Sequence, residues 1–226
     1  MTTADGDAAR PAGERVKIAV LDYGIGNLRS AQKALEHVGA DAVLTGSAEV
    51  IRSADAVVLP GVGSFGACMD ALRSAGLDAL AIEAAESGRP FLGICVGMQM
   101  IYEGSDESPG VPGLGLLSGW VRLLPDTVKR PQMQWNRLVA RRAGDPLLDG
   151  LEADAWMYFV HSYAVDDLSH AIATIDYGGP VVAAVGRGNV WATQFHPEKS
   201  GADGLRLLRN FLKIVRTARD GQVTGV

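Results

Sequence analysis

A cysteine between two glycines is the strongest chemical signal in the sequence. Cys95 lies in Gly93-Ile94-Cys95-Val96-Gly97, between an apolar run and a segment of helical character. A side chain at such a sharp strand-to-helix turn is held out of the sheet, and the strained backbone needs small neighbours. The positive end of the helix also favours a thiolate. The motif indicates a nucleophile, and the alternative is a small buried side chain between packing glycines.

A histidine late in the chain is the candidate base for this nucleophile. His196 follows an apolar strand and precedes a carboxylate, Glu198, by two residues. Glu198 can accept a hydrogen bond from the imidazole and fix its tautomer, as the third member of a triad does. Because the strand ends of an α/β sheet converge on one crevice, the sequence predicts a catalytic triad of Cys95, His196 and Glu198.

Closely spaced glycines after the third apolar run form a third candidate element. Gly61, Gly63 and Gly66 leave backbone N–H groups that can bind a phosphate or stabilise an oxyanion. Their spacing also matches the G-x-G-x-x-G fingerprint of dinucleotide binding. That fingerprint belongs after the first strand, with an acidic residue ending a strand about 20 residues later, and neither condition is met. We therefore favour the oxyanion interpretation.

Alternating strands and helices in the first half of the chain must position these residues. Strands are predicted at residues 16–21, 42–45, 56–59 and 90–94, and helices at 28–38, 66–75, 77–87 and 96–102. The strands are nearly continuous apolar runs, which is typical of a parallel sheet covered by helices on both faces.

The second half of the chain changes character. Strand-like segments follow one another closely at residues 120–124, 135–140, 156–160, 171–176, 181–185 and 190–195, with glycines at the turns. A closing helix over 202–217 is predicted to bury Leu205, Leu208, Leu212 and Val215. The predicted fold is therefore α/β, a three-layer, flavodoxin-like sandwich around a mixed, mostly parallel sheet with extra antiparallel strands in the second half.

Composition bounds the kind of protein. The 226 residues are 47% hydrophobic and 21% charged with a net charge of −5, so one globular domain is expected and no net attraction to nucleic acid or an anionic membrane. Two cysteines exclude a disulfide scaffold, and no spanning apolar run or cluster of metal-ligand spacing occurs. We expect a disordered leader (1–14), a single domain (15–218), a flexible tail (219–226), a cytoplasmic location, and neither metal nor cofactor.

Taken together, these motifs resemble those of the class I (triad) glutamine amidotransferases, and most closely the family of glutaminase subunits of imidazole glycerol phosphate synthase in histidine biosynthesis. The resemblance extends over about residues 16–216 and is carried by the segments DYGIGNL (22–28), LPGVGSFG (59–66), GICVGMQ (93–99), YFVHSY (158–163) and ATQFHPEKSG (192–201).

The resemblance implies a reaction and a set of site residues. Cys95 would attack the carboxamide of L-glutamine, His196 would transfer the proton, and Glu198 would orient His196. Backbone N–H groups near Val62 and Val96 would hold the oxyanion. The residues implied in binding glutamine or its oxyanion are Gly61, Val62, Gly63, Val96, Gln99, Glu107, Ser162 and Tyr163. A solvated loop carboxylate is the alternative for Glu107.

The resemblance also implies a heterodimer with a (β/α)8-barrel cyclase subunit. That subunit would receive ammonia through an internal passage and form imidazole glycerol phosphate and aminoimidazole carboxamide ribotide from a phosphoribulosyl formimino-carboxamide ribonucleotide. The residues expected on the side facing it are Asn27, Trp135, Asn136, Tyr158 and His161. One segment departs from the family: Gln132-Met133-Gln134-Trp135-Asn136 stands where His-Met-Gly-Trp-Asn is usual.

Two other functions remain as alternatives. The first is the glutaminase subunit of another ammonia-channelling synthase, such as pyridoxal phosphate synthase, against which the Val-His-Ser-Tyr segment at 160–163 argues. The second is a non-catalytic α/β module in which Cys95 is a redox sensor. That second alternative leaves His196 and Glu198 without a role.

Overall fold

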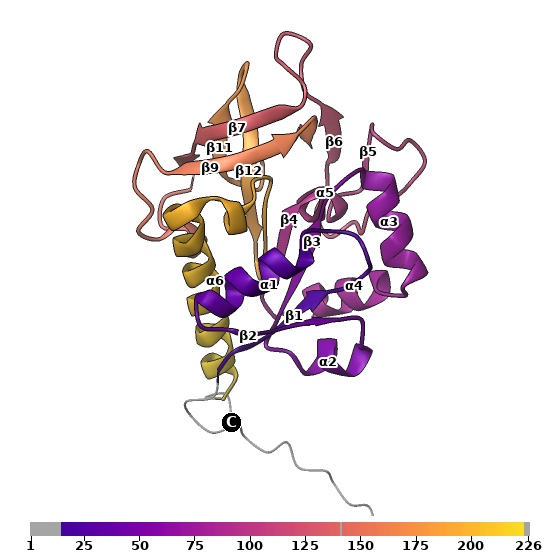
Figure 1. Ribbon diagram of the computed structural model, residues 1–226, viewed down its shortest axis with the longest axis vertical. Helices are drawn as coiled ribbons and strands as arrows, with labels where there is room; N and C mark the ends of the chain where they lie inside the picture. Colours follow the sequence, from indigo (N-terminus) through magenta and orange to yellow (C-terminus); the bar gives the residue numbers. More distant parts are fainter. Residues whose placement is uncertain (1–14, 141, 224–226) are drawn as a thin grey trace, which may run out of the picture.

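The computed structural model of the protein describes residues 15–140 and 142–223, arranged as an α/β sandwich with a smaller β layer above one end of its sheet (Figure 1). The predicted leader, 1–14, and the last three residues of the predicted tail lie outside the described residues. Among the described residues, no helix is long and apolar enough to cross a membrane.

An eight-stranded sheet forms the centre of the molecule. Its strands, in spatial order, are β2 (Asp41–Thr45), β1 (Lys17–Leu21), β3 (Ala56–Gly61), β4 (Phe91–Cys95), β13 (Val190–Thr193), β12 (Pro180–Arg187), β11 (Ala171–Asp176) and β8 (Val139–Ala140). The pairs from β2 to β13 are parallel and those from β13 to β8 are antiparallel. The predicted fold class is thus confirmed.

Helices cover both faces of this sheet. They are α1 (Leu28–His37), α2 (Ala48–Ser53), α3 (Phe65–Ser74), α4 (Asp78–Glu86), α5 (Val96–Met100) and α6 (Gly201–Val223), with short 3-10 turns η1 (Pro146–Leu148) and η2 (Pro197–Lys199). α1 packs with α6 on one side, and α4 contacts both α2 and α3 on the other (Figure 1). The chain reverses its winding direction between β1 and β3, so the crevice at their carboxyl ends is the expected place for a ligand.

Two small sheets complete the fold. One contains β10 (Tyr163–Val165), β6 (Trp120–Leu123) and β5 (Gly104–Ser105), and the other is a ribbon of β7 (Gln132–Arg137) and β9 (Trp156–His161). Three of the strand-like segments predicted in the second half therefore lie mainly outside the central sheet. The segment predicted at 135–140 divides, because β7 pairs with β9 whereas β8 joins the edge of the central sheet.

Two helices differ from the predictions. α2 was not predicted, since its six residues are too few to show a helical period, although Ser47 caps it by accepting a hydrogen bond from the Val50 N–H. α6 extends six residues beyond the predicted end at Thr217, through Val223. Its buried face also includes Leu207 and Phe211, while Leu205 is only half-buried.

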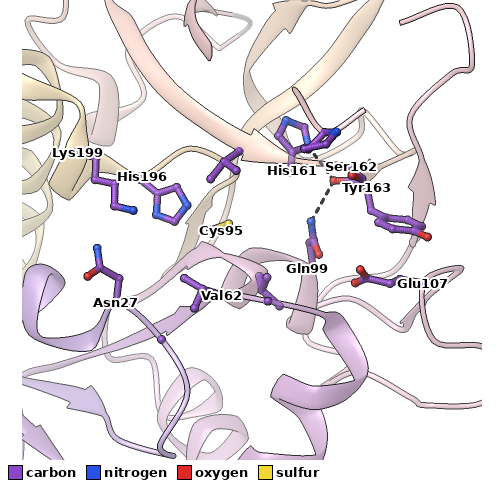
Figure 2. Close-up of a pocket in the computed structure, with 15 residues that line it drawn as sticks. Asn27, Val62, Cys95, Gln99, Glu107, His161, Ser162, Tyr163, His196 and Lys199 are labelled. Atoms are coloured by element: carbon purple, nitrogen blue, oxygen red, sulfur yellow. Dashed lines mark hydrogen bonds between the residues drawn. The ribbon is translucent and has the colours of Figure 1, made fainter. Parts of the chain in front are cut away.

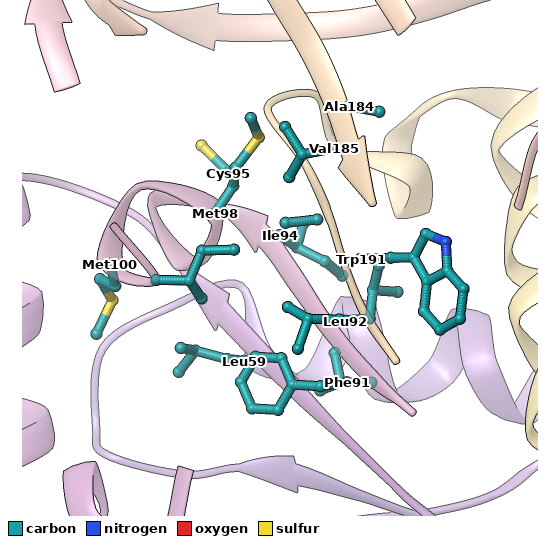
Figure 3. Packing of buried hydrophobic residues seen from close by; sticks show 14 of the residues in the cluster. Leu59, Phe91, Leu92, Ile94, Cys95, Met98, Met100, Ala184, Val185 and Trp191 are labelled. Carbon is teal, nitrogen blue, oxygen red and sulfur yellow. The ribbon is translucent and has the colours of Figure 1, made fainter. Parts of the chain in front are cut away.

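The core around β4 fixes the end of this strand. Leu92 and Ile94 of β4 are buried, and so are Met98 and Met100 of α5, in the apolar cluster around this strand (Figure 3). β3 lies on one side of β4 in parallel register, with Gly61 opposite Cys95. β13 lies on the other side. The end of β4 is therefore held on three sides.

The turn from β4 into α5 has a strained backbone at the predicted nucleophile. Cys95 has φ 57° and ψ −113°, and it is the only non-glycine residue with positive φ in the part of the chain that the structure describes. The flanking glycines are required by space. A Cβ on Gly97 would overlap the carbonyl oxygen of Leu59, and one on Gly93 would lie 2.8 Å from the carbonyl oxygen of Gly97. The G-x-C-x-G spacing thus follows from close packing of β3, β4 and α5.

We expect Gly97→Ala to destabilise the protein by at least about 3 kcal/mol, because the new methyl group meets backbone that cannot move away. Gly46→Ala is the matched control, since the nearest atom, the Asp22 carbonyl oxygen, is 3.5 Å from its Cβ. It should change stability by less than about 1 kcal/mol. Urea unfolding measures both variants, and equal stabilities would contradict this account of the turn.

Candidate active site

A pocket of about 600 Å³ opens at the carboxyl ends of the parallel strands. It is lined by Gly26, Asn27, Val62, Gly63, Cys95, Val96, Gln99, Glu107, Pro131, Val160, His161, Ser162, Tyr163, His196 and Lys199. In Figure 2, His196, Lys199 and Asn27 lie on one side of Cys95, and Gln99, Ser162, Tyr163 and Glu107 lie on the other. Most of the predicted site residues are therefore brought to one cavity.

Cys95, His196 and Glu198 come together at this pocket from two strand ends. His196 Nδ1 lies 2.9 Å from Glu198 Oε1, and each of these two side chains is 2% exposed. The other ring nitrogen, Nε2, has no hydrogen-bond partner elsewhere in the described residues, and the ring lies beside the Cys95 thiol (Figure 2). The arrangement is that of a nucleophile, a base and a group that orients the base.

The electrostatic surroundings of His196 favour the imidazolium. Burial lowers its pKa, but the interactions with Cys95 and Glu198 outweigh burial and raise the pKa to about 9. A proton at Nδ1 donates to Glu198 Oε1, and a second proton at Nε2 faces the sulfur. The ring is thereby prepared to stabilise a thiolate and to supply a proton.

The loop that carries His196 is anchored at several points. Asn27 Nδ2 donates to Glu198 Oε1 at 3.2 Å, which fixes the carboxylate from the β1–α1 side. The His196 N–H donates to the Tyr158 carbonyl at 3.0 Å, and Ser200 Oγ donates to the His196 carbonyl at 2.6 Å. Asn27 was expected on the partner-facing side, and the structure gives it a contact within the site.

The glycine-rich segment after β3 lies across from Cys95. Val62 and Gly63 line the pocket, whereas buried Gly61 packs against the backbone of Gly97, where a Cβ would be 2.8 Å from the Gly97 nitrogen. Tyr23 Oη donates to the Pro60 carbonyl at 2.5 Å. The Cys68 thiol donates to the Val62 carbonyl at 3.2 Å. Side chains from the β1–α1 loop and α3 thus hold the segment beside the nucleophile.

The side of the pocket away from His196 is polar. Gln99 Nε2 donates to the Tyr163 carbonyl at 3.0 Å and to Gln194 Oε1 at 3.1 Å. Glu107 is half-buried, and its Oε2 accepts from the Phe65 N–H at 2.7 Å, at the start of α3. Glu107 is therefore a fixed carboxylate of the pocket wall rather than a solvated loop residue.

The residues predicted to face a partner divide between the two faces of the β7–β9 ribbon. Trp135 pairs with Tyr158, and both lie on the outer face. The next pairs along the ribbon lie on the opposite face, because side chains alternate along a strand. Asn136 donates to the Asp176 carbonyl, and His161 is 6% exposed with both ring nitrogens bonded within the chain. His161 therefore lies in the wall of the pocket, and its predicted position facing a partner stays a prediction.

Sequence analysis missed several residues of the site. Lys199 and Gly26 line the pocket beside motifs that were recognised, and Pro131 and Val160 come from the ribbon and its approach. Gln194 directly follows β13 and places its Nε2 4.0 Å from Cys95 Sγ. Lys199 and Gln194 had a signal, since both lie in the ATQFHPEKSG segment around His196, whereas Pro131 is brought here only by the fold. No group of three or more His, Cys, Asp or Glu side chains suited to a metal ion occurs among the residues described.

Comparison with known families agrees with this geometry. A sequence model of the family "Glutamine amidotransferase class-I" matches residues 19–215, which include the whole pocket. The chain belongs to this family of enzymes, and the predicted resemblance is confirmed.

Several similar curated proteins carry the name "Imidazole glycerol phosphate synthase subunit HisH". The protein of that name from Deinococcus radiodurans is 51% identical over 200 residues, covering 86% of this chain and 92% of the relative. The one from Methanothermobacter thermautotrophicus is 47% identical, covering 88% and 99%.

Solved structures agree in fold. One is a crystal structure described as that of a glutamine amidotransferase, with a TM-score of 0.71 at 23% identity, covering 88% of this chain and 98% of that one. Another is the structure of PurLQS from Thermotoga maritima, with a TM-score of 0.68 at 22% identity, covering 89% and 99%. At these identities the likeness concerns the fold alone.

Glu198→Gln should lower the pKa of His196 from about 9, because the amide retains the hydrogen-bond geometry but removes the negative charge. The imidazolium is the form present below this pKa, so its loss on raising the pH should begin at a lower pH in the variant. NMR titration of the His196 ring measures the shift. An unchanged pKa of His196 in the variant would contradict the pairing with Glu198.

Proposed function

We propose that the chain is the glutaminase subunit of an imidazole glycerol phosphate synthase, hydrolysing L-glutamine to glutamate and ammonia. The observation that carries this proposal is the placement of Cys95, on a strained turn, beside the buried His196–Glu198 pair in a pocket of suitable size. The names of the relatives support the choice of this synthase among those that use glutamine.

In the first half of the reaction, the Cys95 thiolate attacks the side-chain carbonyl carbon of glutamine. Backbone N–H groups of Val62 and Val96 receive the negative charge that develops on the oxygen. Val96 is the first residue of α5, so its N–H has no carbonyl partner within the helix. The C–N bond breaks as His196 transfers its Nε2 proton to the departing nitrogen. Ammonia leaves, and a glutamyl thioester remains on Cys95.

In the second half, neutral His196 takes a proton from water as the water attacks the thioester. Glutamate is released, Cys95 returns to the thiolate, and His196 returns to the imidazolium. Glu198 keeps the ring in the Nδ1–H tautomer throughout, because its carboxylate only accepts. A pKa of about 9 for His196 fits the proton-donating state in which the cycle begins.

The pocket has groups for both charged ends of glutamine. Glu107 is the anion available for the α-ammonium group, and Gln99, Ser162 and Tyr163 supply donors and acceptors on the same side. The carboxamide then reaches Cys95, while the opposite side, near His196, is left for the departing ammonia. This orientation follows from the separation of the two groups of residues about Cys95 (Figure 2).

The outer face of the β7–β9 ribbon is the proposed docking surface for a (β/α)8-barrel cyclase subunit. Met133, Trp135 and Trp156 are large apolar side chains that are all at least 46% exposed. Trp135 and Tyr158 pack edge to face, with ring centroids 6.0 Å apart. Exposed aromatic and methionine side chains gathered on one ribbon are typical of a protein interface. The expected compartment is the cytoplasm.

We expect Cys95→Ala to lower glutamine-dependent product formation by the reconstituted pair by at least about 10³-fold, because the thioester cannot form. Synthesis from added ammonium salt should persist, since the variant still supplies the folded partner. Persistent glutamine turnover in Cys95→Ala would refute the proposed nucleophile.

Trp135→Ala should weaken binding of the cyclase subunit by at least about tenfold in Kd, because a large aromatic side chain is lost from the interface. Val139→Ala is the matched control, since Val139 is an exposed apolar residue on β8 rather than on the ribbon. Calorimetric titration measures both. Equal affinities would place the docking surface elsewhere.

A further inference from the structure

A buried polar chain leads from the ribbon to the nucleophile, and it begins at one of the residues that departs from the family pattern. Gln132 of β7 is fully buried and lies opposite His161 of β9 in the ribbon register. His161 Nδ1 lies 2.8 Å from the Tyr163 carbonyl oxygen. That same carbonyl accepts from Gln99 Nε2, and Gln99 and Gln194 connect it to the surroundings of Cys95 Sγ.

The tautomer of His161 is fixed by its neighbours. A carbonyl oxygen only accepts, so the Tyr163 carbonyl requires a proton on Nδ1. Burial, with a smaller contribution from the charge of His196, lowers the pKa of His161 to about 4, so the ring is neutral near pH 7. Nε2 is then an acceptor. His196 is the titratable group that acts on this ring.

Gln132 is the donor that this acceptor needs. Its Oε1 is placed 2.9 Å from His161 Nε2, while its Nε2 is buried without a partner among the described residues. In this placement two acceptors, Gln132 Oε1 and His161 Nε2, face each other, while the Gln132 amide nitrogen donates to nothing. Exchanging the oxygen and nitrogen of the amide removes the conflict. An N–H of Gln132 then donates to His161 Nε2, so that each nitrogen of the ring has a hydrogen-bond partner of the right kind.

We infer that Gln132 is a positioning residue for glutamine hydrolysis: its side-chain amide locks His161, and through it the Tyr163 carbonyl, in the place where Gln99 is held beside the substrate. The inference rests on the proposed function for its consequence on turnover, but the hydrogen bond itself does not. Gln132 is not among the residues that line the pocket, and the hydrogen bond that links its side chain to the pocket wall is the one with His161.

Gln132→Met tests this directly in the complex with the cyclase subunit. Methionine keeps the length of the side chain and removes the donor, so KM for glutamine should rise about tenfold, with a smaller change in kcat, as Gln99 loses its fixed partner. Asn210→Leu is the control for loss of a buried amide. Asn210 is 1% exposed, donates to the Leu147 and Asp149 carbonyls, and lies outside the pocket lining, so this variant should lose stability without a change in KM.

Gln132→Glu supplies a readout that a merely structural role would not give. One proton shared by the new carboxyl group and His161 restores the hydrogen bond, so activity should approach the wild-type value at low pH. When that proton is lost, the carboxylate and the Nε2 atom are both acceptors, and KM should rise with pH. Wild type and Asn210→Leu should not show this rise of KM with pH.

The result that overturns the inference is an unchanged KM in Gln132→Met, or an equal rise of KM in Asn210→Leu. A second measurement needs no turnover: ¹⁵N NMR of the wild-type His161 ring should show the neutral form protonated at Nδ1, and protonation at Nε2 alone would refute the donor role of Gln132. A wild-type complex that does not hydrolyse glutamine would refute the proposed function, and the NMR result would still decide the hydrogen-bond chain.

Discussion

The strained turn at Cys95 is the constraint on which the rest of the site depends. The backbone at φ 57° places the Cys95 side chain above the edge of the sheet. This strained conformation persists because β3, β4 and α5 are packed too closely for the backbone to adopt another one. The same approach places Gly61 opposite Cys95 in the β3–β4 register. One packing condition, the absence of side chains at positions 93 and 97, thus fixes the position of the nucleophile and of strand β3 beside it.

The charges around His196 are the second feature on which the site depends. His196 lies between Cys95 and Glu198 in a region almost closed to solvent, where an isolated imidazolium would be unfavourable. The two neighbours that carry negative charge when ionised reverse this preference and raise the pKa of the ring to about 9. The loop that holds it is bonded to the backbone of β9. The position of the His196 ring beside the nucleophile therefore depends in part on a hydrogen bond to the ribbon.

The β7–β9 ribbon serves two purposes because a strand has two faces. Its outer face presents Trp135 and Tyr158 to solvent, and its inner face carries Gln132 and His161 into the wall of the pocket. The ribbon is bonded to both sides of the pocket: His161 bonds the Tyr163 carbonyl on the Gln99 side, and the Tyr158 carbonyl accepts from the His196 N–H on the other side. A ribbon of six residue pairs can contribute to both faces because successive side chains along a strand point to opposite sides.

The sequence by itself determined the α/β class, the parallel strands and the Cys95 turn, because apolar runs and glycine spacing are local consequences of burial and sterics. It also indicated His196 and Glu198, which are separated by a single residue. Alternation along a strand separates His161 from Tyr158, but only the tertiary structure decided which of the two faces is covered, because that depends on what packs against the ribbon. The same holds for the link between Gln132 and Gln194, which are far apart in the sequence and are joined only by folding, through His161, the Tyr163 carbonyl and Gln99.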